Sequence, residues 1–210
     1  MPIPLEGASP EVRRQILDAA LELFSGRGYF NTSVQDIRRA AGVSVGSIYH
    51  HFGSKEGIAK ALYDGILEQL DRAVQQAAVG RLSCEERCRA VTLRLFELAE
   101  QEPLMVGFAL NAKHREFMPE QPPICSSGPF ERMRDLVRAG IIRGEILPLD
   151  PMLAAAALFG GPLRLLQLRL DGVLREPLPE LFDLADEGLL GDVAADGVID
   201  LHHRRQRALP

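Results

Sequence analysis

Residues 32–55, TSVQDIRRAAGVSVGSIYHHFGSK, predict two short helices joined by a glycine turn. Ser33 stands before the first helix with Asp36 three places on, so its hydroxyl can accept from a free backbone N–H while the carboxylate favours the positive helix end. Gly42 supplies the backbone freedom to leave this helix, and Ser44 can cap the next one. The stretch therefore predicts a helix-turn-helix, a motif whose second helix enters the major groove of DNA.

The outward face of the second helix has the chemistry to contact base edges, because small residues allow close approach while hydroxyl and imidazole groups supply donors and acceptors. The residues on this face are Val45, Gly46, Ser47, Tyr49 and His50. Lys55 stands at the start of the following helix, where an ammonium and free backbone N–H groups can hold a phosphate oxygen together. Thr32 and Ser33 offer hydroxyl groups at the other edge. The alternative is that Tyr49 and His50 are packing residues only.

Over residues 12–67 the chain resembles the DNA-binding domain of TetR-type transcriptional regulators. Residues 41–58, AGVSVGSIYHHFGSKEGI, reproduce the family's alanine-glycine turn, recognition helix, Tyr-x-His-Phe and lysine-bearing helix start, in order and without gaps. The resemblance implies contacts with phosphates or bases for Thr32, Ser33, Ser44, Val45, Gly46, Ser47, Tyr49, His50 and Lys55. Val45 departs from the family pattern, because many members carry a polar or basic residue there. Its methyl groups suit a thymine methyl.

Length and composition predict a cytoplasmic protein without a disulfide framework. A chain of 210 residues can form a small N-terminal module and a larger domain with its own core. The longest apolar run, residues 152–163, is shorter than the ~20 residues that span a bilayer, and the N-terminus lacks the basic start and apolar stretch of a signal peptide. Three cysteines, an odd number, indicate reduced thiols. We therefore expect no association with a membrane.

The net charge of −5 is unevenly distributed along the chain. Residues 1–55 contain six basic and five acidic side chains, a net charge of +1, so the remainder carries −6. Such a weak local excess predicts that DNA binding relies on shape and on paired half-sites more than on broad electrostatic attraction.

Apolar residues recur at helical spacing along the whole chain, and no alternating apolar pattern is long enough for a strand, so we predict an all-α fold. The predicted helices cover residues 10–26, 34–41, 45–52, 54–79, 83–100, 103–117, 130–143, 150–172 and 179–190, with a proline-rich loop over residues 118–129. The predicted domains are a helix-turn-helix domain over residues 1–55 and a ligand-binding and dimerisation domain over residues 56–210.

The larger domain is expected to enclose a small apolar or aromatic molecule, because a helical bundle with soft, adaptable side chains can form such an interior. The expected lining consists of Phe96, Leu104, Met105, Phe108, Phe117, Met133 and Val137. Asn111 and His114, three residues apart on one predicted helix, can hydrogen-bond this ligand. The alternative is that both are surface groups or satisfied core groups.

Residues 150–172 predict one long, very apolar helix, with a kink expected at Pro162. A helix that is apolar on all sides must be buried, and its small residues allow close approach in a four-helix dimer interface. The expected interface residues are Leu153, Ala157, Gly160 and Leu168. The alternative is that the helix lies at the centre of a single subunit's core.

The resemblance implies a homodimeric repressor that binds a palindromic DNA operator and is released by a small-molecule effector. One alternative is a regulator switched by a partner protein or by thiol chemistry at Cys84, Cys88 or Cys125. For Cys84 and Cys88, a small apolar role is favoured over a metal site because no histidine lies nearby in the sequence. A second alternative is an enzyme on a helical scaffold. The chain contains no G-x-S-x-G, H-E-x-x-H or phosphate-binding glycine motif, so we predict no catalytic residue, metal or cofactor.

Overall fold

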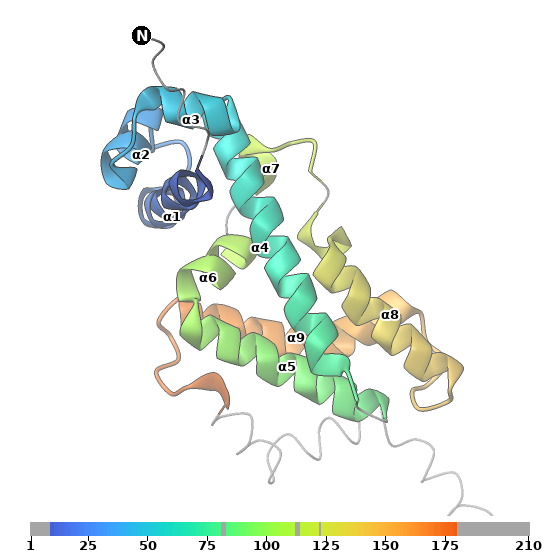
Figure 1. Cartoon of the computed structure of the whole chain (residues 1–210). Helices are drawn as coiled ribbons and strands as arrows, with labels where there is room; N and C mark the ends of the chain where they lie inside the picture. The colour runs from blue at the N-terminus through green and yellow to red at the C-terminus, as the bar shows by residue number, and fades with distance from the viewer. Residues whose placement is uncertain (1–8, 81–82, 112–113, 122, 180–210) are drawn as a thin grey trace, which may run out of the picture. The chain divides into compact units, whose positions relative to one another are not determined.

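A computed structural model describes residues 9–80, 83–111, 114–121 and 123–179 of the protein. Every secondary-structure element within these residues is helical, which confirms the predicted all-α fold (Figure 1). The elements are α1 Pro10–Arg27, α2 Val34–Ala41, α3 Val45–Phe52, α4 Lys55–Ala78, α5 Cys84–Gln101, α6 Pro103–Asn111, α7 His114–Phe117, the 3-10 turn η1 Ile124–Ser126, α8 Gly128–Ile142 and α9 Pro151–Leu170. The helix predicted over residues 179–190 lies outside the described residues, apart from residue 179.

The chain divides into two compact units. The first unit consists of Met1–Leu67 and Leu104–Pro123, and so holds α1, α2, α3, the first half of α4, nearly all of α6, and α7. The second unit consists of Glu68–Pro103 and Ile124–Pro210, and holds the rest of α4 together with α5, α8 and α9. The boundary predicted at residue 55 coincides with the first residue of α4, and the first unit continues along that helix.

The caps of the first unit are those that the sequence predicts. The N–H of Asp36 donates to the Ser33 hydroxyl at 3.1 Å, and the N–H of Ser33 donates to the Asp36 carboxylate at 2.9 Å. Gly42 ends α2 in the left-handed conformation with φ 67°, where glycine is favoured over residues with a side chain. The N–H of Ser47 donates to the Ser44 hydroxyl at 3.0 Å, so α3 begins immediately after the turn.

Buried apolar residues hold α1, α2 and α3 together around one small core. Its fully buried members are Ile16, Ala20, Ile37 and Ile48. α3 contributes only Ile48 from its centre. The side of α3 opposite Ile48 is therefore exposed to solvent.

Two elements differ from the sequence prediction. The helix predicted over residues 103–117 is two helices in the structure, α6 and α7. The loop predicted over residues 118–129 contains η1 and the first turn of α8, because Pro129 is tolerated at a helix start, where its missing N–H would be unpaired in any case. α9 continues through Pro162.

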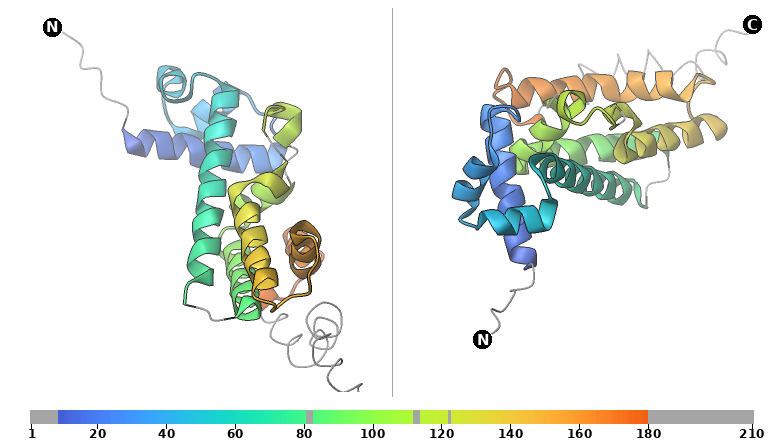
Figure 2. Two further views of the ribbon diagram at one scale, coloured as in Figure 1. Left: turned by 90° about the vertical axis from the view of Figure 1, so that its right-hand side faces the viewer. Right: turned by 90° about the horizontal axis from the view of Figure 1, so that it is seen from above.

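In the second unit, α5, α8 and α9 pack against one another (Figure 2). Two bidentate ion pairs reinforce this packing. Arg132 of α8 donates to both carboxylate oxygens of Asp71 of α4 at 2.7 Å. Arg169 of α9 donates to both carboxylate oxygens of Glu100 of α5 at 2.8 Å. Paired guanidinium and carboxylate groups fix the relative orientation of the helices that carry them.

α9 is buried along one side only. Its buried residues are Ala154, Ala155, Phe159 and Leu166, whereas Met152 and Leu153 are exposed. Among the described helices, it is also the one that is long and apolar enough to cross a membrane, judged by length and composition alone. The uninterrupted apolar run within this helix ends at Arg164, as the sequence predicts, and a single helix of this kind is weak evidence for a membrane span. The expectation that this apolar helix is buried on all sides does not hold within one chain.

Candidate nucleic-acid interface

The recognition helix α3 presents a small, polar surface to solvent. Ile48 is fully buried, and this anchor turns the opposite side of the helix outward. The exposed residues at this surface are Ser44, Val45, Gly46, Tyr49 and His50, with Ser47 half-buried beside them. The ring of Tyr49 is 52% exposed. The structure thus brings six of the nine predicted contact residues together on one continuous segment.

Ser44 and Ser47 form one hydrogen-bonding unit at the start of α3. Their hydroxyl oxygens lie 2.8 Å apart, and the Ser44 oxygen also accepts the N–H of Ser47. Since a hydroxyl carries one donor and two acceptor positions, the pair still has capacity for an external partner. It can therefore meet either a donor or an acceptor on a base edge.

The start of α2 is fixed by a charged network. Hydrogen bonds from Ser33 are the main cause that lowers the pKa of the Asp36 carboxyl to about 2. The Arg39 guanidinium donates to the same carboxylate at 2.6 Å and acts in the same direction. Arg38 and Arg39 form the last turn of α2 and add positive charge next to the turn that leads to α3. Neither arginine was among the predicted contacts, although the sequence already places both near the end of the first helix of the motif.

Thr32 and Lys55 both turn inward. The Thr32 side chain is 1% exposed and its hydroxyl donates to the carbonyl oxygen of Gly28 at 2.9 Å. The Lys55 ammonium donates to the carbonyl oxygens of Tyr29 and Thr32, each at 3.1 Å. An ammonium has three N–H donors, so one remains for an external acceptor. Lys55 therefore holds the loop between α1 and α2 onto the start of α4.

Tyr29 is the centre of this arrangement, and no local pattern in the sequence indicates its role. Its ring stacks on Phe117 with centroids 4.2 Å apart, and the Lys55 ammonium lies 4.1 Å from the same ring centroid. Its hydroxyl donates to the Glu56 carboxylate at 3.0 Å. Burial, followed by this carboxylate, raises the pKa of Tyr29, so the phenol stays protonated. Tyr29 thereby links α7, the α1–α2 loop and α4.

Gly57 sets the junction between α3 and α4. A Cβ atom at this position would lie 1.9 Å from the carbonyl oxygen of Phe52, the last residue of α3. No side chain fits into that space unless the backbone moves. The sequence shows this glycine within the KEGI segment but not the close approach that requires it.

The predicted effector residues are divided between the two units. Met105, Phe108 and Phe117 belong to the first unit, where Phe108 stacks on Phe24 of α1 with centroids 6.3 Å apart. The remaining lining residues Phe96, Met133 and Val137 are buried in the second unit. Leu104 is largely exposed. The side chains of Asn111 and His114 lie outside the described residues.

The predicted dimer residues lie along the exposed side of α9. Leu153 is 59% exposed, Ala157 and Gly160 are exposed, and Leu168 is half-buried. Within one chain, the apolar side chains at the first half of this row have no covering partner among the described residues. The spacings of four, three and eight residues place them on one helix face.

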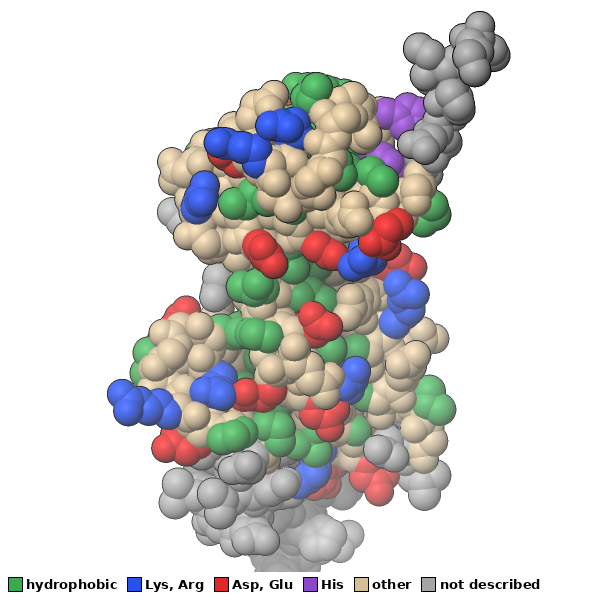
Figure 3. Space-filling model, turned by 60° about the vertical axis from the view of Figure 1, so that its left-hand side comes forward, with side chains coloured by type: hydrophobic (Ala, Val, Ile, Leu, Met, Phe, Trp, Pro, Cys, Tyr) green, Lys and Arg blue, Asp and Glu red, His purple; other side chains and the backbone are tan. Residues whose placement is uncertain are grey.

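Charges on the face shown in Figure 3 are mixed, with basic and acidic side chains interspersed. This agrees with the small charge excess of the N-terminal module. Among the described residues, no group of three or more His, Cys, Asp or Glu side chains is arranged to hold a metal ion.

A capped α2, a glycine turn and an α3 with an exposed small, polar surface define a helix-turn-helix DNA-binding protein. The family model for bacterial regulatory proteins of the tetR family matches residues 16–62. The HTH-type transcriptional regulator TtgR of Pseudomonas putida is 30% identical over 201 residues, which cover 87% of this chain and 86% of that protein. The chain therefore belongs to the TetR family of transcriptional regulators.

Two further similarities concern different parts of the chain. The HTH-type transcriptional repressor KstR2 of Rhodococcus jostii is 35% identical over 85 residues, which span 40% of this chain and only 42% of that protein. The crystal structure of the transcriptional regulator FadR from Bacillus subtilis in complex with stearoyl-CoA has a TM-score of 0.69 and 25% identity, covering 83% of this chain and 95% of that one. The likeness to FadR thus extends through both units.

Proposed function

We propose that the protein is a homodimeric transcriptional repressor that binds a palindromic operator and is released by a molecule with a large apolar or aromatic part. The observation that carries this proposal is the α3 surface, on which small and polar residues are exposed opposite the buried Ile48. Membership of the TetR family supports the same function. We expect the protein to act in the cytoplasm, where the operator is.

The proposed DNA contacts follow from the exposure of each side chain. Ser47 and His50 are placed to meet base edges, and Tyr49 to meet a phosphate. Further contacts come from Ser33, Ser44, Val45 and Gly46, and from the remaining N–H of the Lys55 ammonium. The Thr32 side chain is left out of the proposed contacts because it is buried and its hydroxyl already donates within the protein.

The proposed homodimer is supported by the exposed side of α9. Leu153, Ala157 and Gly160 form an apolar row on which small residues permit close helix approach. A two-fold axis at this row places the same surface of both subunits in contact, as an isologous dimer requires. Two α3 helices then address half-sites about one helical turn apart or a little more.

The effector class is inferred from the buried apolar residues of the second unit. Soft aromatic and methionine side chains there, such as Phe96 and Met133, adapt to an apolar ligand. The stearoyl-CoA in the FadR structure belongs to that protein, and it supports an effector with a large apolar part.

A route from effector to DNA exists within the first unit. Two aromatic pairs connect α6 and α7 to the start of the unit: Phe108 of α6 stacks on Phe24 of α1, and Phe117 of α7 stacks on Tyr29 in the α1–α2 loop. The Lys55 ammonium donates to the carbonyl oxygen of Tyr29 and also to that of Thr32, the residue directly before the α2 cap. An effector that shifts α7 therefore acts on the start of the helix-turn-helix. A tenfold change in operator binding needs a preference of about 1.4 kcal/mol for one state.

The proposal is tested by selecting operator fragments from a random DNA pool and measuring binding by fluorescence anisotropy. Ser47→Ala and His50→Ala should alter which sequences are selected, because they change base contacts. Lys60→Ala is the matched control: it removes an exposed cation of α4 and should leave the selected sequence unchanged. Unchanged selection and affinity in both α3 variants would contradict the assignment of α3 as the reading helix.

A further inference from the structure

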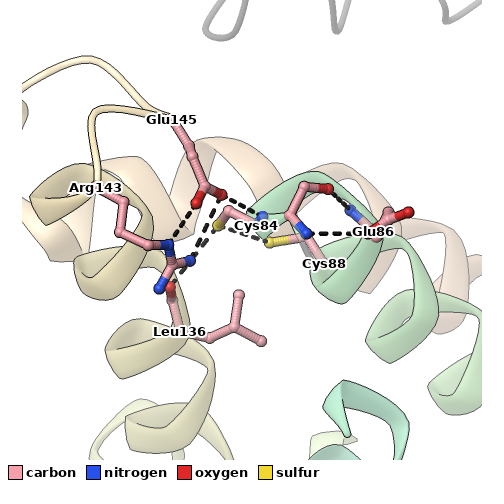
Figure 4. Close-up of polar contacts among 7 residues, drawn as sticks. Cys84, Glu86, Cys88, Leu136, Arg143 and Glu145 are labelled. Carbon is pink, nitrogen blue, oxygen red and sulfur yellow. Dashed lines mark hydrogen bonds and ion pairs between the residues drawn. The ribbon is translucent and has the colours of Figure 1, made fainter. Parts of the chain in front are cut away.

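Two thiols lie side by side on α5, in the second unit. Cys84 is the first residue of the helix and Cys88 follows one turn later, with their sulfur atoms 3.9 Å apart (Figure 4). Both are free cysteines, and neither belongs to the proposed DNA or effector contacts. Their proximity provides a pair of soft ligands on a rigid helical frame.

The backbone of α8 covers one side of this pair. The Cys84 sulfur lies 3.7 Å from the carbonyl oxygen of Leu136, and a Cβ atom at Gly140 would lie 2.6 Å from the same sulfur. Only glycine lets α8 come this close. Cys84 is 1% exposed whereas Cys88 is half-buried, so a small molecule reaches the pair from Cys88.

The charges around the pair distinguish the two thiols. The hydrogen bond with Cys88 lowers the pKa of the Cys84 thiol; burial and the charge of Glu145 oppose this shift, and Arg143 acts with it. The same hydrogen bond, together with burial, raises the pKa of Cys88. The Glu145 carboxylate accepts the N–H of Cys84 and pairs with Arg143 (Figure 4). The two thiols therefore lose their protons as a coupled pair.

Geometry favours a bridging atom over a direct disulfide. Cβ atoms four residues apart on a helix are about 5–6 Å apart, whereas a disulfide needs them at about 3.5–4.5 Å. Oxidation would therefore unwind the first turn of α5. A single atom bonded to both sulfurs avoids this strain, because the sulfurs already lie 3.9 Å apart and a small side-chain adjustment lets them share it with the helix intact.

We propose that Cys84 and Cys88 form a dithiol site for a thiophilic atom that bonds to both sulfurs. The third substituent of this atom is part of the ligand and is not supplied by the protein. A trivalent arsenic atom with one organic group fits this description. The described residues offer no set of three ligands for a bare metal ion. With phenylarsine oxide, both thiols lose a proton and two As–S bonds replace the As=O bond. The oxygen leaves as water, and no atom is oxidised or reduced.

The test is the intact mass of the protein after incubation with phenylarsine oxide and a wash with excess monothiol. A chelate held by two thiols survives this wash, because release of one sulfur leaves the other attached, whereas a single thiol adduct exchanges away. Wild type and Cys125→Ser should each retain one phenylarsenic group per chain. Cys84→Ser and Cys88→Ser should retain none.

Gly140→Ala provides an independent check, because it keeps both thiols but displaces the Cys84 sulfur, and it should retain less of the adduct. Circular dichroism establishes that each variant is folded. Loss of the adduct from the wild type during the wash would overturn the proposal. Its retention in either serine variant at residue 84 or 88 would do the same. Neither result bears on DNA binding.

Discussion

Placing a charge on the exposed row of α9 tests how the protein assembles. Ala157 is exposed in the single chain, so the change Ala157→Glu puts a carboxylate into water there. Glutamate is a good helix former, and surface substitutions of this kind change the stability of one subunit by less than about 0.5 kcal/mol. In the proposed dimer the same position is covered by the partner subunit, and the carboxylate loses its water.

The size of the effect follows from symmetry. A buried charged group without a partner costs about 2 kcal/mol or more, and a two-fold interface contains two copies of every residue. The dimer should therefore lose about 4 kcal/mol, which corresponds to a dissociation constant raised roughly 10³-fold. Operator affinity should fall with it, because each monomer then holds a single half-site.

Sedimentation velocity over a range of protein concentrations measures this dissociation directly. Val79→Glu is the matched control, since Val79 is 69% exposed at the end of α4 and lies outside the α9 row. Circular dichroism shows whether the variants keep the helix content of the wild type. If folded Ala157→Glu dissociates at the same concentration as wild type and control, the exposed side of α9 is not the dimer interface.

Three further predictions concern packing and charge. Glu100→Gln weakens the ion pair with α9 and should cost about 1 kcal/mol at pH 7 in urea unfolding. Because its hydrogen-bonded arginine lowers the pKa of Glu100 below the usual 4.5, this contribution is present above that value, and the difference between wild type and variant should vanish as the pH falls through the lowered pKa. Phe117→Leu removes the ring stacked on Tyr29 and should lower the free energy of unfolding by about 0.5–1.5 kcal/mol. It should also change the effector concentration at which half of the operator is released. If neither the stability nor this concentration changes, the coupling route is wrong. Gly57→Ala should cost about 1–3 kcal/mol and weaken operator binding, whereas Gly65→Ala, in open space on the same helix, should be neutral or stabilising by thermal unfolding.

Local patterns predicted the first unit well. A cap such as Ser33 and a turn such as Gly42 act over three or four residues, so their consequences are visible in the sequence. The recognition helix follows from the same signals. The predicted ranges of α4 and α5 agree with the structure to within one residue at either end. For α5, Ser83 and Glu86 form the expected capping box.

Contacts between distant residues could not be predicted in this way. Lys55 reaches carbonyl groups 23 and 26 residues earlier, and no spacing rule indicates such a partner. The role of Tyr29 depends on Phe117, which is on a different helix. The composition of α9 also did not indicate which of its sides is buried, because alanine and glycine are compatible with both a buried and an exposed surface.

The close approach of Gly57 to the last carbonyl of α3 has a consequence for redesign of the binding specificity. Apart from the buried Ile48 and the capping Ser44, residues 44–50 have side chains that can be exchanged without disturbing the chain behind them. Residues 52–57 join α3 to α4, and Gly57 leaves no room for a side chain at the end of this segment. A library that varies the first segment and preserves the second would change what is read while keeping the angle at which the helix is presented.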